Sequence, residues 1–119
     1  MKKIVMYGIK NCDTVGKAIK WLQQHDIPHF FHDIRSDGLS KKMLEKWLAS
    51  AKFETILNKK SATWRKLPAE AQEKISKHKS IDLLLEWPTM IKRPVLEIDG
   101  VIHVGFTKDK YAIIFSSKI

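Results

Sequence analysis

The first 34 residues predict a strand, a helix and a second strand, and this order constrains the fold more than any other feature. Residues 3–7 form an apolar strand pattern, and a helix is predicted from about Cys12 to His25. Pro28 rules out a longer helix, and residues 29–34 predict the second strand. A short helical crossover joins parallel strands, so these two strands are expected to be neighbours. The apolar face of the helix is predicted to consist of Val15, Ala18, Ile19 and Leu22.

The middle of the chain is predicted to be helical. Ser40 is a favourable N-cap for a helix through Ala51. Residues 53–67 have a mixed pattern, Pro68 is expected to open a helix over 69–77, and residues 81–87 favour a further short helix. The buried stripe of the first of these helices is predicted to be Met43, Leu44, Trp47, Leu48 and Ala51.

Asp99-Gly100 is the strongest hairpin signal in the chain, because such a pair suits the tight turn between two antiparallel strands. The turn is expected to join strands over 95–98 and 101–104, and Thr107 is expected to cap a last helix that runs to about Phe115. The complete order predicts a single α/β domain over residues 1–119. Its architecture is expected to be thioredoxin-like, a four-stranded mixed sheet with flanking helices and a helical insertion over about 40–90.

Composition limits the location and the partners of the chain. Its single cysteine cannot form an internal disulfide, and the apolar stretch near the start is too short for a signal peptide. No apolar run approaches the roughly 20 residues of a membrane helix. A soluble, monomeric, cytoplasmic protein without a membrane partner is expected. The formal net charge of +9 favours an anionic partner, but the basic residues are dispersed and no DNA-reading motif occurs, which disfavours direct nucleic-acid binding.

Cys12 lies between the first predicted strand and the first predicted helix. A thiol at a helix N-terminus faces unpaired N–H groups and the positive end of the helix dipole, which favour the nucleophilic thiolate. Free cysteine is also a common core residue. The residues around Cys12 are polar, however, namely Lys10, Asn11, Asp13 and Thr14. This position favours chemistry over packing.

Three segments of the chain resemble the recurring motifs of the arsenate reductase-like family, close to its monothiol branch and to Spx. The similarity runs nearly end to end, and the segments occur in the family's order. They are Tyr7-Gly8-Ile9-Lys10-Asn11-Cys12-Asp13-Thr14-Val15, Thr63-Trp64-Arg65-Lys66-Leu67 and Ile91-Lys92-Arg93-Pro94-Val95.

The resemblance implies that Cys12 is a nucleophile and that Arg93 binds an anion. In glutaredoxin-linked arsenate reductases a cysteine in this loop attacks the oxyanion, and arginines bind it. Arg93-Pro94 matches one arginine motif, and the family's usually cis proline implies that Pro94 shapes a loop beside the thiol. The segments 56–60 and 103–106 contain no arginine at the other two family positions. Since lysine does not reproduce the bidentate fork of arginine, arsenate binding is expected to be weak.

Spx relatives are regulators that bind RNA polymerase, and many carry a Cys-x-x-Cys switch in this loop. Val15 stands where the second thiol would be, so that switch cannot operate here. The resemblance therefore favours a thiol oxidoreductase without a bound cofactor, with glutathione as co-substrate and glutaredoxin as a possible partner. The alternative is a non-enzymatic regulator that binds RNA polymerase.

Other polar residues are weaker candidates. Lys10 and Asn11, beside Cys12, and Lys59 and Lys60 are candidates for anion binding, although loop lysines are usually just solvated. His103 is a weak candidate for a base. No metal site is predicted from the histidines: Pro28 separates His25 from His29, and His29 and His32 point to opposite faces of a strand.

Overall fold

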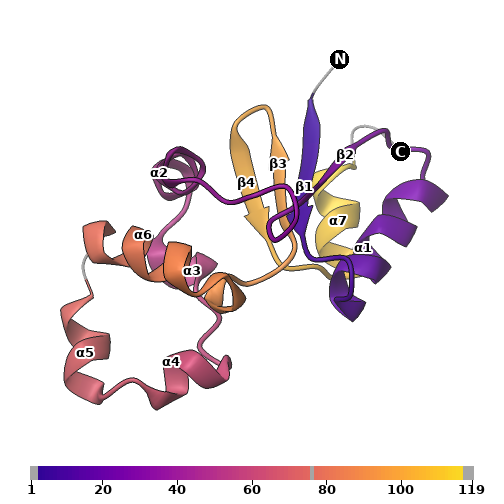
Figure 1. The fold of residues 1–119 in the computed structure, drawn as a ribbon. Helices are drawn as coiled ribbons and strands as arrows, with labels where there is room; N and C mark the ends of the chain where they lie inside the picture. The colour runs from indigo at the N-terminus through magenta and orange to yellow at the C-terminus, as the bar shows by residue number, and fades with distance from the viewer. Residues whose placement is uncertain (1–2, 76, 117–119) are drawn as a thin grey trace. The chain divides into compact units, whose positions relative to one another are not determined.

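A computed structural model gives the structure of residues 3–75 and 77–116, which divide into two compact units (Figure 1). The sheet unit combines the two ends of the chain, up to Ile34 and from Arg93 onward. The helical unit is the continuous segment Arg35–Lys92. It extends a few residues beyond the predicted insertion of about 40–90 at both ends. The interpretation of the chain as a single domain stays a prediction.

The sheet unit contains four strands in the order β2-β1-β3-β4. β1 (Ile4–Gly8) pairs in parallel with β2 (Phe30–Asp33). It pairs on its other side with the antiparallel strand β3 (Val95–Ile98), which in turn pairs with β4 (Val101–Val104). The predicted mixed sheet is therefore confirmed, with the two N-terminal strands as neighbours.

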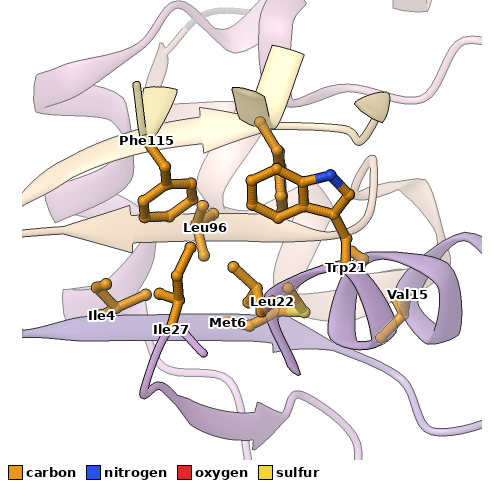
Figure 2. Packing of buried hydrophobic residues seen from close by; sticks show 10 residues of the cluster. Ile4, Met6, Val15, Trp21, Leu22, Ile27, Leu96 and Phe115 are labelled. Atoms are coloured by element: carbon orange, nitrogen blue, oxygen red, sulfur yellow. The ribbon is translucent and has the colours of Figure 1, made fainter. Parts of the chain in front are cut away.

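Two helices cover one face of this sheet, α1 (Asp13–Gln24) and α7 (Lys108–Ile114) (Figure 1). Their apolar residues pack on Ile4, Met6 and Leu96 of the strands (Figure 2). Within α1 the structure buries Trp21 and leaves the predicted Ile19 only half-buried. Helical periodicity alone could not decide between these two edges of the apolar stripe, because the position of α7 determines which edge is covered.

The connections of the sheet unit agree with the local sequence signals. Asp99 and Gly100 have φ angles of 49° and 87°, as a tight hairpin turn between β3 and β4 requires. The Thr107 hydroxyl accepts a hydrogen bond from the backbone N–H of Lys110 at 3.0 Å and caps α7. Both features follow from residues next to one another in the sequence.

The helical unit begins with α2 (Lys41–Ser50), which Ser40 caps by accepting a hydrogen bond from the Met43 N–H at 3.2 Å. Of its predicted stripe, Leu44, Trp47 and Leu48 are buried. Its remaining segments are the α-helices α3 (Phe53–Ile56), α4 (Ala62–Lys66), α5 (Ala69–Lys74) and α6 (Lys77–Glu86), and the 3-10 helix η1 (Pro88–Met90).

Two boundaries of the helical unit differ from the sequence prediction. α5 ends at Lys74 rather than residue 77, because Ile75 leaves helical geometry with φ −70° and ψ 109°. α6 begins at Lys77 rather than Ile81, since its first turn contains no apolar residue that periodicity could detect. None of the described helices has the length and apolar character needed to cross a bilayer.

Candidate active site

Cys12 occupies the N-cap of α1, at the end of the loop that follows β1. Its thiol is half-buried and makes no capping hydrogen bond. The backbone is well fixed: the Cys12 carbonyl accepts from the Gly16 N–H at 2.9 Å, and the Cys12 N–H donates to the Ile9 carbonyl at 3.3 Å. An N-cap side chain lies beside the N–H groups of the first helical turn.

Asp33 fixes the loop that carries Cys12. This carboxylate is 4% exposed, and its Oδ2 accepts a hydrogen bond from the Lys10 N–H at 3.3 Å. Next to it, the Ile34 N–H donates to the Gly8 carbonyl at 2.9 Å. Asp33 was not among the predicted site residues, although an acidic residue at the end of the apolar second strand was a signal for such a role.

Gly8 and Val15 determine how closely α1 approaches β1. A Cβ atom on Gly8 would lie 2.8 Å from Cγ2 of Val15, which is closer than real side chains approach. Val15 is 1% exposed and belongs to the core cluster. The position that carries the second thiol in Cys-x-x-Cys relatives is therefore a packing position in this chain.

Arg93 and Pro94 lie at the end of the sheet that also carries Cys12. Val95 is opposite Tyr7 in the antiparallel pair of β1 and β3, so the residues just before β3 lie beside the loop that follows β1. The Arg93–Pro94 peptide bond is cis, as the resemblance implied. Pro94 is buried and its carbonyl accepts from the Gly105 N–H at 2.8 Å, whereas Arg93 is half-buried.

The remaining anion-binding candidates belong to both units. Lys10 and Asn11 are exposed in the loop before Cys12. Lys59 and Lys60 are exposed in the helical unit, where the Asn58 side-chain oxygen accepts from the Lys60 N–H at 3.1 Å. They line a cavity of about 300 Å³ together with Glu54, Leu57, Asn58 and Lys92. The roles assigned to these lysines and to Asn11 stay predictions.

The ring nitrogens of two histidines considered as metal ligands contact the backbone. His25 Nδ1 is 2.8 Å from the Trp21 carbonyl oxygen, and His29 Nδ1 is 3.1 Å from the Ile27 carbonyl oxygen. Within residues 3–75 and 77–116, no group of three or more His, Cys, Asp and Glu side chains could hold a metal ion.

Burial changes the titration of two groups on the sheet. It raises the pKa of Tyr7, and the carboxylate of Glu97 adds to this effect, so the phenol remains protonated at neutral pH. Burial also lowers the pKa of His103, and the cationic Lys110 lowers it further. His103 lies on β4, which β3 separates from β1, so strand order does not favour it as a base for Cys12.

We expect His103 to make the stability of the protein depend on pH. Its pKa in the folded state is below the ordinary value of 6.5, so the unfolded chain binds more protons at this site as pH falls below that value. Stability should therefore decrease on acidification through this window. Urea unfolding at several pH values should show that His103→Gln loses less free energy of unfolding on acidification than the wild-type protein does. Parallel pH profiles of the two proteins would contradict this prediction.

Comparisons with known proteins agree with this arrangement. A family model described as the ArsC family matches residues 7–114. The chain is 42% identical over 113 residues to an uncharacterized protein of Haemophilus influenzae, covering 95% of this chain and 99% of the other. It is 26% identical over 109 residues to the global transcriptional regulator Spx 1 of Lactococcus lactis, covering 90% and 84%.

Two solved structures have the same fold. A protein called YFFB superposes with a TM-score of 0.84 at 42% identity, covering 93% of this chain and 97% of the other. An arsenate reductase related protein from Brucella melitensis gives a TM-score of 0.80 at 40% identity, covering 98% and 96%. These likenesses confirm the predicted thioredoxin-like architecture.

Proposed function

Because this chain belongs to the ArsC family, we propose that it is a glutathione-dependent thiol oxidoreductase of the cytoplasm with Cys12 as its nucleophile. The observation that carries the proposal is the half-buried thiol at the N-cap of α1, at the same end of the sheet as Arg93 and Pro94. The N-terminus of α1 and the guanidinium of Arg93 together favour an anionic sulfur and an anionic substrate.

The reaction proceeds by thiol–disulfide exchange. The Cys12 thiolate attacks one sulfur of oxidised glutathione, the disulfide bond breaks, and the second glutathione leaves as a thiolate. In the reductive direction a thiolate from solution attacks the mixed disulfide on Cys12 and releases Cys12 as a thiolate. Because Val15 takes the place of a resolving thiol, this second thiolate comes from glutathione or a partner such as glutaredoxin.

Arg93 orients the substrate through one of the two carboxylates of glutathione. Its guanidinium suits a carboxylate because the planar fork offers two parallel donors. Pro94 shapes the loop that carries it, since the buried proline is held by the hydrogen bond from Gly105. Lys10 and Asn11, in the loop before Cys12, are secondary anion contacts in this proposal.

We expect Arg93→Ala to slow the formation of the glutathione adduct on Cys12 by about tenfold to a hundredfold. Such a loss corresponds to one charge-assisted hydrogen bond of about 1.5–3 kcal/mol. The second-order rate with oxidised glutathione is measured by mass spectrometry. Arg65→Ala is the matched control, because it removes the same charge from an exposed position on α4.

One further variant and one further substrate complete this experiment. Cys12→Ser should give no adduct, and arsenate offered with glutathione and glutaredoxin should be reduced slowly, because two family arginines lack counterparts. Equal rates for Arg93→Ala and Arg65→Ala would remove the assigned role of Arg93. A wild-type protein that forms no adduct would overturn the oxidoreductase proposal.

The second candidate function is that of a regulator that binds RNA polymerase. It is favoured by the match to Spx 1, which extends over 90% of this chain, and by the net charge of +9. Purified RNA polymerase distinguishes the two functions: a regulator binds it whether or not Cys12 is replaced by serine. An oxidoreductase forms a glutathione adduct that requires Cys12 and that a thiol from solution removes again.

A further inference from the structure

A basic cavity of about 350 Å³ lies in the sheet unit, between α1 and the start of α7. Its lining on α1 begins at Lys17, five residues after Cys12, and ends at Gln24. A helix rises about 1.5 Å per residue, so the lining begins about 8 Å from Cys12 along the helix axis. The lining residues are Lys17, Lys20, Trp21, Gln24, Phe106 and Lys108.

The rim of this cavity carries three positive charges. Lys17 and Lys20 share one face of α1 with Gln24, and Lys108 approaches from the first residue of α7. All three lysines are exposed, and among the described residues no carboxylate lines the cavity. Like charges three residues apart repel one another, so an anion bound between them removes an unfavourable interaction.

The floor of the cavity is apolar and firmly held. Trp21 is 6% exposed, and the His25 ring stacks on its indole with centroids 3.9 Å apart. The other neighbours of Trp21 include Phe115, at 5.8 Å between ring centroids (Figure 2). Phe106 is half-buried and packs edge-on against Tyr111 at 4.6 Å. This rigid floor beneath flexible cations suits a ligand with an apolar part and an anionic end.

We propose that this cavity binds a small organic phosphate ester, with the phosphate between the lysines and the organic part on Trp21 and Phe106. A phosphate dianion matches several cations better than a single carboxylate does. The volume lies at the lower end of the range for small-molecule sites, which favours a compact metabolite over a macromolecular segment. The proposal is independent of thiol chemistry, because no group assigned to that chemistry lines the cavity.

The test is an NMR titration of the ¹⁵N-labelled full chain with adenosine 5′-monophosphate as the probe. Amide shifts should concentrate on residues 17–24 and 106–108. The probe should bind about tenfold more tightly than inorganic phosphate or adenosine, since neither contains both parts of the ligand. Cys12→Ser should bind the probe unchanged, which separates this site from the proposed oxidoreductase.

Matched variants distinguish a specific site from diffuse attraction. Lys20→Gln should weaken binding of the probe about fivefold, and Lys42→Gln, which removes the same charge from α2, should leave it within about twofold. Phe106→Leu should weaken binding of the probe but not binding of inorganic phosphate. Any of three outcomes would overturn the proposal. The first is that Lys20→Gln and Lys42→Gln weaken binding equally, and the second is that phosphate and the probe bind with equal affinity. The third is that the amide shifts are confined to residues around Cys12 and Arg93.

Discussion

Replacing Tyr111 by alanine should lower the free energy of unfolding by about 3–5 kcal/mol, the usual cost of removing a large aromatic side chain from a core. Tyr111 is fully buried, and its ring centroid lies 4.6 Å from that of Phe106, 5.6 Å from Trp21 and 6.0 Å from Phe115. Its removal leaves a cavity between α7 and α1. Urea unfolding followed by circular dichroism measures the loss.

Tyr111→Phe separates the ring from its hydroxyl. The phenolic oxygen is buried without a hydrogen-bond partner among the described residues, and burial raises the pKa of Tyr111, so the group remains neutral. Removing an unsatisfied hydroxyl should change stability by less than about 1 kcal/mol, or increase it. A loss for Tyr111→Phe as large as that for Tyr111→Ala would show that the hydroxyl, rather than the ring, stabilises this core.

The second large effect is expected for Gly8→Val, which should destabilise the protein by about 3 kcal/mol, the upper end of the usual cost of overpacking. Valine favours strands, so the expected loss comes from the clash with Val15 and not from strand propensity. The variant should also slow the reaction of Cys12 with iodoacetamide, because relief of the clash displaces the start of α1. Unfolding and alkylation rates measure the two effects.

A double-mutant cycle assigns the cause of this effect. Val15→Ala removes both atoms that a Cβ on Gly8 would approach within about 3 Å. Gly8→Ala combined with Val15→Ala should therefore be less destabilising than the sum of the two single changes, with a coupling of about 1 kcal/mol. Additive free energies would mean that the contact with Val15 does not cause the loss of stability.

Elements determined by neighbouring residues were predictable from the sequence. The Asp99-Gly100 turn and the caps Ser40 and Thr107 each depend on contacts within a few positions, and the structure contains all three. The burial of Trp21 in place of Ile19 was not predictable in this way. It depends on α7, which lies at the other end of the sequence.

The candidate site shows the same division between local and distant information. The position of Cys12 at the N-cap of α1 was predictable, because it follows from the local pattern of strand and helix. The location of Arg93 beside the same end of the sheet followed from the family resemblance and not from spacing, since strand register brings it there. Asp33 was not predicted, because it holds the Cys12 loop through a hydrogen bond from the backbone N–H of Lys10, 23 positions earlier in the sequence.

The register between β1 and β3 has a consequence for the order of folding. Ile4 pairs with Ile98, so this contact closes a loop of about 90 residues, and its entropic cost rises with the logarithm of that length. The turns of α2 and α6 and the hairpin of β3 and β4 close over short separations and carry a much smaller cost. We infer that folding is limited by the meeting of the chain ends, and that substitutions in β1 slow folding more than substitutions in α2.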